Sequence, residues 1–459
     1  MVEAKIGLEI HGYLNTKEKL FCRCRAERHS AKKGIMANSN ICPVCTGMPG
    51  CKPMLPNAEA VRKIIQIALM LGCKINTADC VNGLVWQRKH YSWPDLPKGY
   101  QTTISGPYST EVGILGKFGG IGITECHLEE DPAAWNPETG RVDYNRSGLP
   151  LIEMVTEPDF TTSGQVVEWL KELLLTLSYI NTLDKNAGIK ADVNVSINNG
   201  ERVEVKNITS IESIKKSIEY EIFRQEKEGA VRETRRYDEQ EDKTISMRKK
   251  EQAEDYRFIP DPDLPILKIS EKEVLEIKKK LPETPKEKLE GLVKKHKIDK
   301  KNAEILYRNF EIAEFFEQVA EKVGADFAIS WVNIELLRVL NWNKKSLEEV
   351  NIKPEHFIEL LKLVKEGKIT ELKAKQILNE FVPESFSPKE KLGEMAIIGD
   401  KKEIEEIVKE VVKKNEKSAA DYKSGKQEAL NFLIGEVMKA SNRRADYKSV
   451  RKILEKLLA

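Results

Sequence analysis

Charge imbalance, cysteine and long apolar runs are all scarce in this sequence, and each scarcity excludes a class of protein. The 75 Lys and Arg residues are nearly balanced by 73 Asp and Glu, a formal net charge of +2, so no overall field attracts nucleic acid or an acidic membrane. No apolar run approaches the ~18 residues of a transmembrane helix, and the first residues lack the pattern of a signal peptide. We therefore expect a cytoplasmic protein without a membrane segment. Eight cysteines in 459 residues are too few for a disulfide framework, which leaves metal binding or packing.

Several common catalytic motifs are also missing. The sequence contains no GxxxxGKS/T phosphate loop, no GxSxG nucleophile elbow and no GxGxxG fingerprint. These absences disfavour the common nucleotide-binding folds. They also leave the chain without an evident serine or cysteine nucleophile motif.

Composition divides the chain into a mixed part and a helical part, as its length beyond one hydrophobic core predicts. Up to about Pro265, stretches that alternate like strands, such as AKIGLEI and ADVNVSI, are separated by Gly, Pro, Asn and Thr. Its clearest predicted helix is QVVEWLKELLLTLSYI, with Ser163 as the expected N-cap. From Ser270 onward helical periodicity prevails, and LPETP at 281–285 marks a linker. The predicted fold class is α+β, a mixed α/β domain followed by helical domains.

Four cysteines have the spacing of zinc ligands. Cys22 and Cys24 form a CxC pair, and Cys42 and Cys45 form a CxxC pair after 17 intervening residues. Each pair can span one edge of a tetrahedron, so we predict a closed structural Zn²⁺ site. Four ordinary buried thiols within so short a segment are the less favoured alternative. The remaining cysteines lack such spacing and are expected to pack in the core: Cys51, Cys73, Cys80 and Cys126.

Acidic and histidine side chains alternate with apolar ones in the first predicted strand. Glu9 and His11 are two residues apart, so both project from the same face of a strand. Leu8 and Ile10 then face the core. Carboxylates on such a face suit a hard cation such as Mg²⁺, which is usually bound together with substrate phosphates.

A second strand, HLEED at 127–131, repeats this pattern. Alternation places His127, Glu129 and Asp131 on one face and Glu130 on the other, unless the chain turns before Pro132. Each acid taken alone is equally explained as a solvated charge, and a single histidine as a hydrogen-bonded core residue. Only their clustering beside apolar residues favours a site.

Longer motifs extend over nearly the whole chain. They are GLEIH (7–11), KHYSWPDLPKGYQ (89–101), HLEED (127–131), DYNRSGLPLIEMVTEPD (143–159), ADVNVSI (191–197), EVKNITSI (204–211), ETRRYDEQEDKT (233–244), EDYRFIPDPDLP (254–265) and DYKSGKQEALNFLIGEVMKAS (421–441). In order and spacing this series resembles the B subunits of the tRNA-dependent amidotransferase GatCAB. The related archaeal E subunits carry an extra inserted domain that is not visible here, so the B subunit is preferred.

The resemblance implies a domain organisation and a reaction. The domains are a cradle-shaped catalytic domain with a zinc-binding insertion (1–290), a helical domain (291–398) and a small tail domain of the YqeY type (399–459). The reaction is that of a ligase acting on Asp-tRNA(Asn) or Glu-tRNA(Gln): ATP phosphorylates the side-chain carboxylate, and ammonia then displaces the phosphate. ATP, Mg²⁺ and structural Zn²⁺ are the implied cofactors. The implied partners are misacylated tRNA, the small C subunit of the complex and its amidase, the A subunit, which takes ammonia from glutamine.

The resemblance also assigns site residues, position by position. The implied catalytic and magnesium-binding set is Glu9, His11, Glu130 and Glu153, which requires the chain to turn at Glu130 and overrides the alternation of HLEED. The positions implied around ATP or the acyl end of the tRNA are Arg88, Lys89, Tyr91, Asp192, Lys206 and Asn207. One departure is Lys190, which stands where the family has an arginine and offers a point contact in place of a bidentate one.

The last segment is the most basic part of the chain. Residues 399–459 contain 15 Lys and Arg against 11 Asp and Glu, a net charge of +4. The resemblance gives this tail a role in tRNA binding, for which we expect Lys423, Lys426, Lys439, Arg443, Arg444 and Lys448. A solvated helix surface is the general alternative for such a run of charge.

Two other functions use part of the same evidence. A non-catalytic tRNA-binding scaffold explains the basic tail and the cysteines but has no use for the acid and histidine clusters. A metal-dependent hydrolase uses those clusters but does not need the tail. Consumption of ATP that depends on misacylated tRNA separates all three functions.

Overall fold

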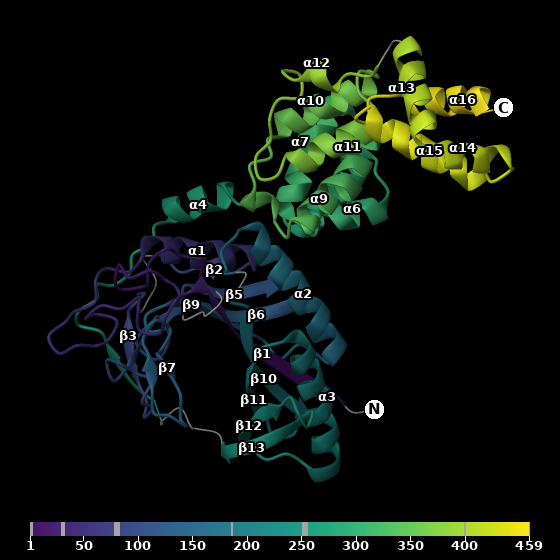
Figure 1. Ribbon diagram of the computed structural model, residues 1–459. Helices are drawn as coiled ribbons and strands as arrows, with labels where there is room; N and C mark the ends of the chain where they lie inside the picture. The colour runs from purple at the N-terminus through teal and green to yellow at the C-terminus, as the bar shows by residue number, and fades with distance from the viewer. Residues whose placement is uncertain are drawn as a thin grey trace. The chain divides into compact units, whose positions relative to one another are not determined.

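The chain forms two compact units in a computed structural model, Met1–Thr284 and Pro285–Ala459 (Figure 1). The structure describes residues 3–28, 33–77, 83–184, 187–249, 256–398 and 401–458. Among them, no helix is both long and apolar enough to cross a membrane. The expected α+β fold class is confirmed, since a mixed α/β unit precedes a helical one.

Unit 1 is built on one large sheet, which has 12 strands in the part of the chain that is described. Its strands are β1 (Ala4–Tyr13), β2 (Lys74–Ile75), β3 (Gln87–His90), β4 (Gln101–Thr103), β5 (Gly113–Phe118), β6 (Ile121–Glu130), β9 (Pro150–Thr156), β10 (Ile189–Ile197), β11 (Val203–Ile208), β12 (Glu233–Asp238), β13 (Lys243–Lys249) and β14 (Arg257–Pro260). Two short strands, β7 (Ala134–Trp135) and β8 (Val142–Asp143), pair separately between β6 and β9.

The strand order brings segments from distant parts of the sequence together at the centre. The main path is β13-β12-β11-β10-β1-β9-β6-β4-β3-β14, and all neighbours on it are antiparallel except β11 and β12. β1 therefore lies between β10 and β9, so the GLEIH motif is flanked by PLIEM and ADVNVSI. Figure 1 shows that the sheet bends from β13 through β1 to β3.

Helices cover one face of this sheet and leave the other face for polar side chains (Figure 1). They are α1 (Ala58–Met70), α2 (Ser163–Tyr179) and α3 (Ile211–Glu228), and α4 (Glu271–Lys279) follows near the end of the unit. Leu8 and Ile10 of β1 are almost fully buried in the core that these helices share with the sheet, as the alternation predicts.

The predicted helix at 165–180 is α2, but its N-cap differs from the expected one. Thr162, not Ser163, has extended backbone angles and accepts a hydrogen bond from the backbone N–H of Gln165. Ser163 is the first helical residue, and its hydroxyl donates to Glu219 of α3. The sequence offers two adjacent hydroxyls, and tertiary contacts decide which one caps the helix.

Unit 2 is helical and contains two separate hydrophobic clusters, one from Leu292 to Met395 and one from Ile398 to Leu458. The first comprises α5 (Pro285–His296), α6 (Lys300–Leu306), α7 (Phe310–Val323), α8 (Ala325–Ser330), the π-helical η3 (Trp331–Leu336), α9 (Leu337–Trp342), η4 (Leu347–Glu349), α10 (Pro354–Lys365), α11 (Glu371–Glu380) and α12 (Leu392–Met395). The second comprises α13 (Lys401–Lys414), α14 (Glu416–Lys423), α15 (Gln427–Ala440) and α16 (Tyr447–Leu458).

The observed divisions lie close to those expected from composition. The two units meet at Thr284 and Pro285, inside the predicted linker and ahead of the expected boundary at 290. The change from one hydrophobic cluster to the next falls beside residue 399, which is itself outside the described residues. The three-domain division remains a prediction.

Candidate functional site

A cleft of about 570 Å³ lies on the polar face of the sheet in unit 1. Its wall combines carboxylates, lysines, arginines and tyrosines from several strands and the loops between them. The lining residues are Glu9, His11, Tyr13, Lys89, Tyr91, Asp95, Gln101, Glu129, Asp131, Pro132, Arg146, Leu151, Glu153, Lys190, Asp192, Arg202, Glu204, Lys206, Asn207, Arg232, Thr234 and Tyr256.

Strand register places His11, Glu153 and His127 in one row across β1, β9 and β6. The Nε2 atoms of the two histidines lie 3.1 Å (His11) and 3.3 Å (His127) from the same carboxylate oxygen of Glu153. Glu129 lies beside this row, with Oε1 3.9 Å from His11 Nε2. The ligand atoms of His11, Glu129 and Glu153 lie within 4.8 Å of one another, which suits a small divalent cation.

The protonation of this row follows from its charges. Burial disfavours an imidazolium at His11, but the Glu153 carboxylate outweighs it and raises the pKa of His11 to about 9. The pKa of Glu153 is held well below its usual value, despite burial, by His127 and His11. Burial and the neighbouring Glu153 raise the pKa of Glu129. A bound cation would neutralise the Glu153 carboxylate in place of the protonated histidines.

A second carboxylate group lies beside the first, formed by Glu9, Asp192 and Glu204 with ligand atoms within 4.8 Å of one another. Lys206 Nζ lies 3.0 Å from Asp192 Oδ2 and 3.5 Å from Glu204 Oε1. Burial opposes the charge of Lys206, but Asp192 and Glu204 raise its pKa. Asn194 donates to Glu9 Oε1 at 3.1 Å. The group thus offers both carboxylate oxygens and an ammonium, as the binding of a nucleotide with its cation requires.

Two of the residues assigned by resemblance lie away from these groups. Glu130 accepts hydrogen bonds from Lys98 Nζ and from the backbone N–H of Thr102, the latter at 3.0 Å. It faces the side of β6 opposite Glu129, because β6 continues without a turn through Glu130. The assignment of Glu130 to the set with His11 and Glu153 therefore does not fit this structure, and the alternation of HLEED predicted the face correctly.

Arg88 is the other residue that the structure does not bring to the cleft. Its guanidinium pairs with both oxygens of buried Asp261, at 3.0 and 3.1 Å, and with Asp263 at 3.0 Å. It joins β3 to the segment after β14 and does not line the cleft. Alternation along β3 explains this, since its neighbour Lys89 does line the cleft, with Nζ 4.7 Å from the ring centroid of Tyr256.

The other predicted ATP or acyl-end residues lie together at the cleft: Lys89, Tyr91, Asp192, Lys206 and Asn207. Asn207 has a φ of 59°, and its backbone N–H donates to Asp192 Oδ1 at 2.7 Å. A register shift between β10 and β11 accompanies this contact. Lys190 lies in the cleft wall, where burial lowers its pKa.

The set of site residues implied by the resemblance did not include Glu129, His127 or Glu204. Alternation along HLEED had already placed His127 and Glu129 on one face with each other. For Glu204, the signal available was its spacing of two residues from Lys206, which puts both side chains on one face if the segment is a strand. Neither signal shows which strands are neighbours, and the closeness of these residues depends on that.

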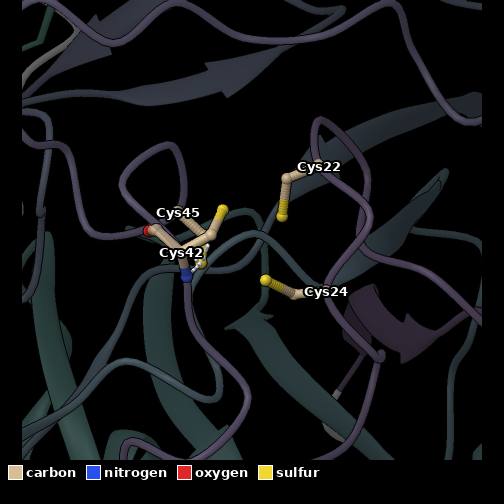
Figure 2. A group of neighbouring side chains, drawn as sticks. All are labelled: Cys22, Cys24, Cys42 and Cys45. Atoms are coloured by element: carbon tan, nitrogen blue, oxygen red, sulfur yellow. Dashed lines mark hydrogen bonds between the residues drawn. The ribbon is translucent and has the colours of Figure 1, made fainter.

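The four predicted zinc ligands lie together at one place. Figure 2 shows Cys22 and Cys24 from one loop facing Cys42 and Cys45 from another. Their sulfur atoms are all within 4.8 Å of one another, and Cys42 and Cys45 Sγ are 3.9 Å apart. A tetrahedral zinc site with Zn–S bonds near ~2.3 Å needs sulfurs about 3.8 Å apart, so the four residues fit that ion.

Two further features support a metal at these cysteines. A hydrogen bond from Cys22 and the buried ammonium of Lys19, acting against burial, lower the pKa of Cys45 to about 5, so this thiol is readily deprotonated. Lys19 is almost fully buried, and its Nζ lies 3.5 Å from Cys45 Sγ. Gly47 has a φ of 66°, and a Cβ there would lie 2.3 Å from the carbonyl oxygen of Pro97, so only glycine allows this packing.

The remaining cysteines and the basic tail divide into several environments. Cys73 and Cys126 are buried, with sulfurs 4.0 Å apart. Cys51 is exposed, so its predicted core position is wrong, and Cys80 lies outside the described residues.

In the tail, Lys426 and Lys439 pair with Asp421 and Glu436, and Arg444 donates to the carbonyl of Ala396. Lys423, Arg443 and Lys448 are exposed.

The fold and the cleft define a protein with a sheet-based cleft lined by carboxylates, histidines and cationic side chains, a cluster of four cysteines and helical domains. Two family models match the chain: the GatB/GatE catalytic domain over residues 4–275 and the GatB domain over residues 314–458. Similar proteins include the B subunit of the aspartyl/glutamyl-tRNA(Asn/Gln) amidotransferase of Methanocaldococcus jannaschii, 45% identical over 100% of this chain and 98% of the relative. The B subunits of that name from Methanopyrus kandleri (42%; 100% and 99% covered) and Methanothermobacter thermautotrophicus (41%; 96% and 97% covered) are also similar. The chain therefore belongs to the GatB family of amidotransferase B subunits.

Proposed function

We propose that this chain is the subunit that activates and amidates the aminoacyl group of Asp-tRNA(Asn) or Glu-tRNA(Gln). The names of its relatives support the reaction class. The observation that carries the proposal is that one cleft brings together two groups of side chains whose oxygen and nitrogen atoms could hold cations, His11 with Glu129 and Glu153, and Glu9 with Asp192 and Glu204.

Activation precedes amidation because a carboxylate is a poor electrophile. Its negative charge repels nucleophiles and its oxygen is a poor leaving group. Transfer of the γ-phosphoryl group of ATP to the side-chain carboxylate gives an acyl phosphate, and attack of ammonia on its carbonyl carbon releases inorganic phosphate. A divalent cation, when bound, neutralises the charge of the phosphoryl group.

Residues of the chain supply the remaining requirements. Lys206 lies where its ammonium can contact phosphate oxygens of ATP, and Asp192, fixed by the backbone N–H of Asn207, orients that lysine. Lys89 and Lys190 add positive charge at the cleft wall and can hold the carboxylate of the aminoacyl group. His11, Glu129 and Glu153 are the residues that would hold the cation near that carboxylate.

Ammonia and tRNA come from outside this chain. We propose that an amidase, the A subunit, releases ammonia from glutamine, that a small C subunit belongs to the same complex, and that the basic tail binds the tRNA. The missing nucleophile motif supports a separate amidase. The designation of the relatives as B subunits supports a complex of several chains.

Reconstitution tests this function directly. The chain would be combined with candidate A and C subunits, ATP, glutamine and each misacylated tRNA, and the esterified amino acid would be analysed for its amide. We expect asparagine or glutamine on the tRNA with the parent chain and none with Glu153→Gln. Release of free amino acid without amide would instead favour a hydrolase, and tRNA binding without ATP use would favour a scaffold.

A further inference from the structure

The loop that carries Cys42 and Cys45 is hydrogen-bonded to the turn between β8 and β9. Asn38 contributes three of these bonds: its backbone N–H donates to Asp143 Oδ1 at 2.9 Å, its Nδ2 donates to the carbonyl of Val142 at 3.0 Å, and its Oδ1 accepts from the Tyr144 N–H at 2.7 Å. Strand β8 and the first residue of the turn after it are therefore hydrogen-bonded to the cysteine loop.

Asn145 is the centre of this contact. Its side chain is fully buried, its Nδ2 donates to the carbonyl of Met36 at 2.6 Å, and its Oδ1 accepts from the backbone N–H of Asn40 at 2.8 Å. Ser147 Oγ also donates to the carbonyl of Cys45 at 2.6 Å. These bonds satisfy polar groups of both loops, so the position of one loop fixes the position of the other.

Lys19 links the thiolates themselves to the same turn. Its buried Nζ lies 3.5 Å from Cys45 Sγ and donates to the carbonyl of Tyr144 at 3.0 Å. The next residue, Leu20, donates its backbone N–H to the carbonyl of Gly148 at 2.8 Å. The segment that leads to Cys22 and Cys24 is thus attached to both ends of the turn.

The turn, once held in this position, contacts the ends of β6 and β9, the two strands that carry Glu129 and Glu153. Arg146 donates from Nε to the carbonyl of Pro132 at 2.9 Å, and its Nε lies 3.3 Å from Asp131 Oδ2. Backbone bonds of 2.9 Å and 2.8 Å join Gly148 to Asp131 and Asp131 to Leu149. Glu129 lies two residues before Asp131 in the chain. Glu153 lies after Leu149, in β9.

Asp131 also connects the turn to β1. Asp131, which is buried, accepts a hydrogen bond of 2.7 Å from the hydroxyl of Tyr13. Tyr13 lies two residues after His11 on the same face of β1. All three residues of the first ligand group are therefore within a few residues of contacts that end at the cysteine loop.

We propose that residues 36–45 and 142–148 form a brace that positions His11, Glu129 and Glu153, so that a metal on the four cysteines raises the affinity of the cleft for a divalent cation. The inference rests on the proposed function, because it assumes that the cleft binds a cation. A metal fixes the two cysteine loops relative to each other, and the hydrogen bonds above carry that constraint to the turn. Outer contacts that orient metal ligands alter metal affinity by roughly 10- to 100-fold, and coupling between two sites is reciprocal.

Binding of Mn²⁺ to the full-length chain tests the brace, with zinc content measured on the same samples. We expect an Mn²⁺ site in the parent that is lost in His11→Ala. Asn145→Ala, which leaves every cysteine and every cleft ligand in place, should weaken that site at least about tenfold while zinc remains bound. Cys42→Ser should lose zinc and weaken Mn²⁺ binding to a similar extent.

Matched variants separate the brace from general destabilisation. Asn136 lies in the same connection, where its Oδ1 accepts only from Glu138 and Thr139 within its own turn in the contacts that are described. Asn136→Ala and exposed Cys51→Ser should leave Mn²⁺ affinity unchanged. Hydrogen exchange of residues 142–149 should become faster in Asn145→Ala and Cys42→Ser, and not in the two controls.

The outcomes distinguish this inference from the proposed function. If His11→Ala loses Mn²⁺ but Asn145→Ala binds it as tightly as the parent, the brace is wrong and the cation site stands. If the parent binds no Mn²⁺, or His11→Ala binds it normally, the cation site fails and the brace fails with it. Should Cys42→Ser not fold, parent protein stripped of zinc by a chelator takes its place, and an unchanged Mn²⁺ affinity in that sample would overturn the coupling.

Discussion

Glu129 and Glu130 are adjacent in the chain but face opposite sides of β6, and single substitutions separate their roles. Glu129→Gln removes a charged ligand beside His11, so we expect the affinity of the cleft for Mn²⁺ to fall at least about tenfold with little change in stability. Glu130→Gln leaves the half-buried ammonium of Lys98 without its carboxylate partner, at a cost on the order of 2 kcal/mol.

Calorimetry of both variants, with and without Mn²⁺, checks this pair. The Glu130→Gln protein should unfold at a lower temperature and still bind Mn²⁺ in the way the parent does. If Glu130→Gln abolishes Mn²⁺ binding while Glu129→Gln retains it, the resemblance assigned the ligand correctly and Glu130, not Glu129, faces the cleft.

His11 makes cation binding depend on pH. Its pKa of about 9 in the metal-free protein means that a cation must displace a proton from the imidazole at neutral pH. The affinity for Mn²⁺ should therefore rise by about tenfold per pH unit above pH 6 and level off near pH 9. In His11→Gln this slope should become shallower, and in His356→Gln, a histidine of unit 2, it should be unchanged. A pH-independent affinity in the parent would contradict the assignment.

The same pKa shift gives the metal-free protein a pH-dependent stability. Because the pKa of folded His11 is raised above that of the unfolded chain, its charged form stabilises the fold fully below about pH 6.5, and this contribution is lost as the pH rises through about 9. Unfolding of metal-free protein in denaturant at pH 6 and pH 9 measures it. His11→Gln should reduce the difference between the two conditions.

Which single residues share a face could be predicted from the sequence, and which faces meet could not. Period-two alternation identified Glu9, His11 and Glu129, because it depends only on strand geometry. The closeness of His127 and Glu153 depends on the pairing of β6 with β9, which local sequence does not encode. Motif resemblance selected Glu130, which contacts Lys98 and Thr102 in the structure, because two neighbouring acids in HLEED satisfy the same pattern.

Helix α2 offers a test of how its first turn is held. Thr162→Ala removes the hydroxyl that accepts from the Gln165 N–H, so the local free energy of opening of that turn should fall by about 1 kcal/mol. Ser163→Ala removes an exposed contact with Glu219 and should lower the same free energy of opening by only about 0.3 kcal/mol. Hydrogen exchange of the first turn of α2 measures both. Equal effects of the two substitutions would show that the hydroxyls share the cap.

Individual helices and strands were predicted more reliably than the order of the strands in the sheet. The apolar periodicity of α2 and the alternation of β1, β6 and β10 gave these elements from sequence, since both patterns arise from local backbone geometry. The order of strands in the sheet depends on contacts between segments more than a hundred residues apart, such as β1 with β9 and β10. The cysteine spacing was informative because ligands of a tetrahedral metal come in close pairs on short loops, and the structure brings the four sulfur atoms together.

The tail is expected to add tRNA affinity without taking part in the chemistry. A chain that ends at Gly399, assembled with its partners, should show a KM for misacylated tRNA raised by about tenfold or more, with the Mn²⁺ site of unit 1 unchanged. Replacing exposed Lys423 and Lys448 by Glu should act in the same direction and flatten the dependence of tRNA affinity on salt. An unchanged KM across a salt series would make the tail a solvated helical cap.

The division between the two compact units could be read from composition because linkers and cores differ in residue type, and the separate tail domain stays a prediction. The prolines of LPETP marked the place where the two compact units separate, and the change in hydrophobic cluster beside residue 399 lies where glycine interrupts the helical pattern. The complex itself could not be read from this one chain. The partners that complete the reaction are inferred from chemistry and from the names of relatives.

The central claim is that this chain phosphorylates the aminoacyl group of a misacylated tRNA. The most direct measurement is release of ADP from ATP by the reconstituted complex, with glutamine withheld and the tRNA added in three forms: misacylated, correctly acylated and uncharged. We predict ADP release that requires the misacylated form and disappears in His11→Ala and Glu153→Gln. ADP release that is equal with all three forms, or unchanged in both variants, would contradict the account.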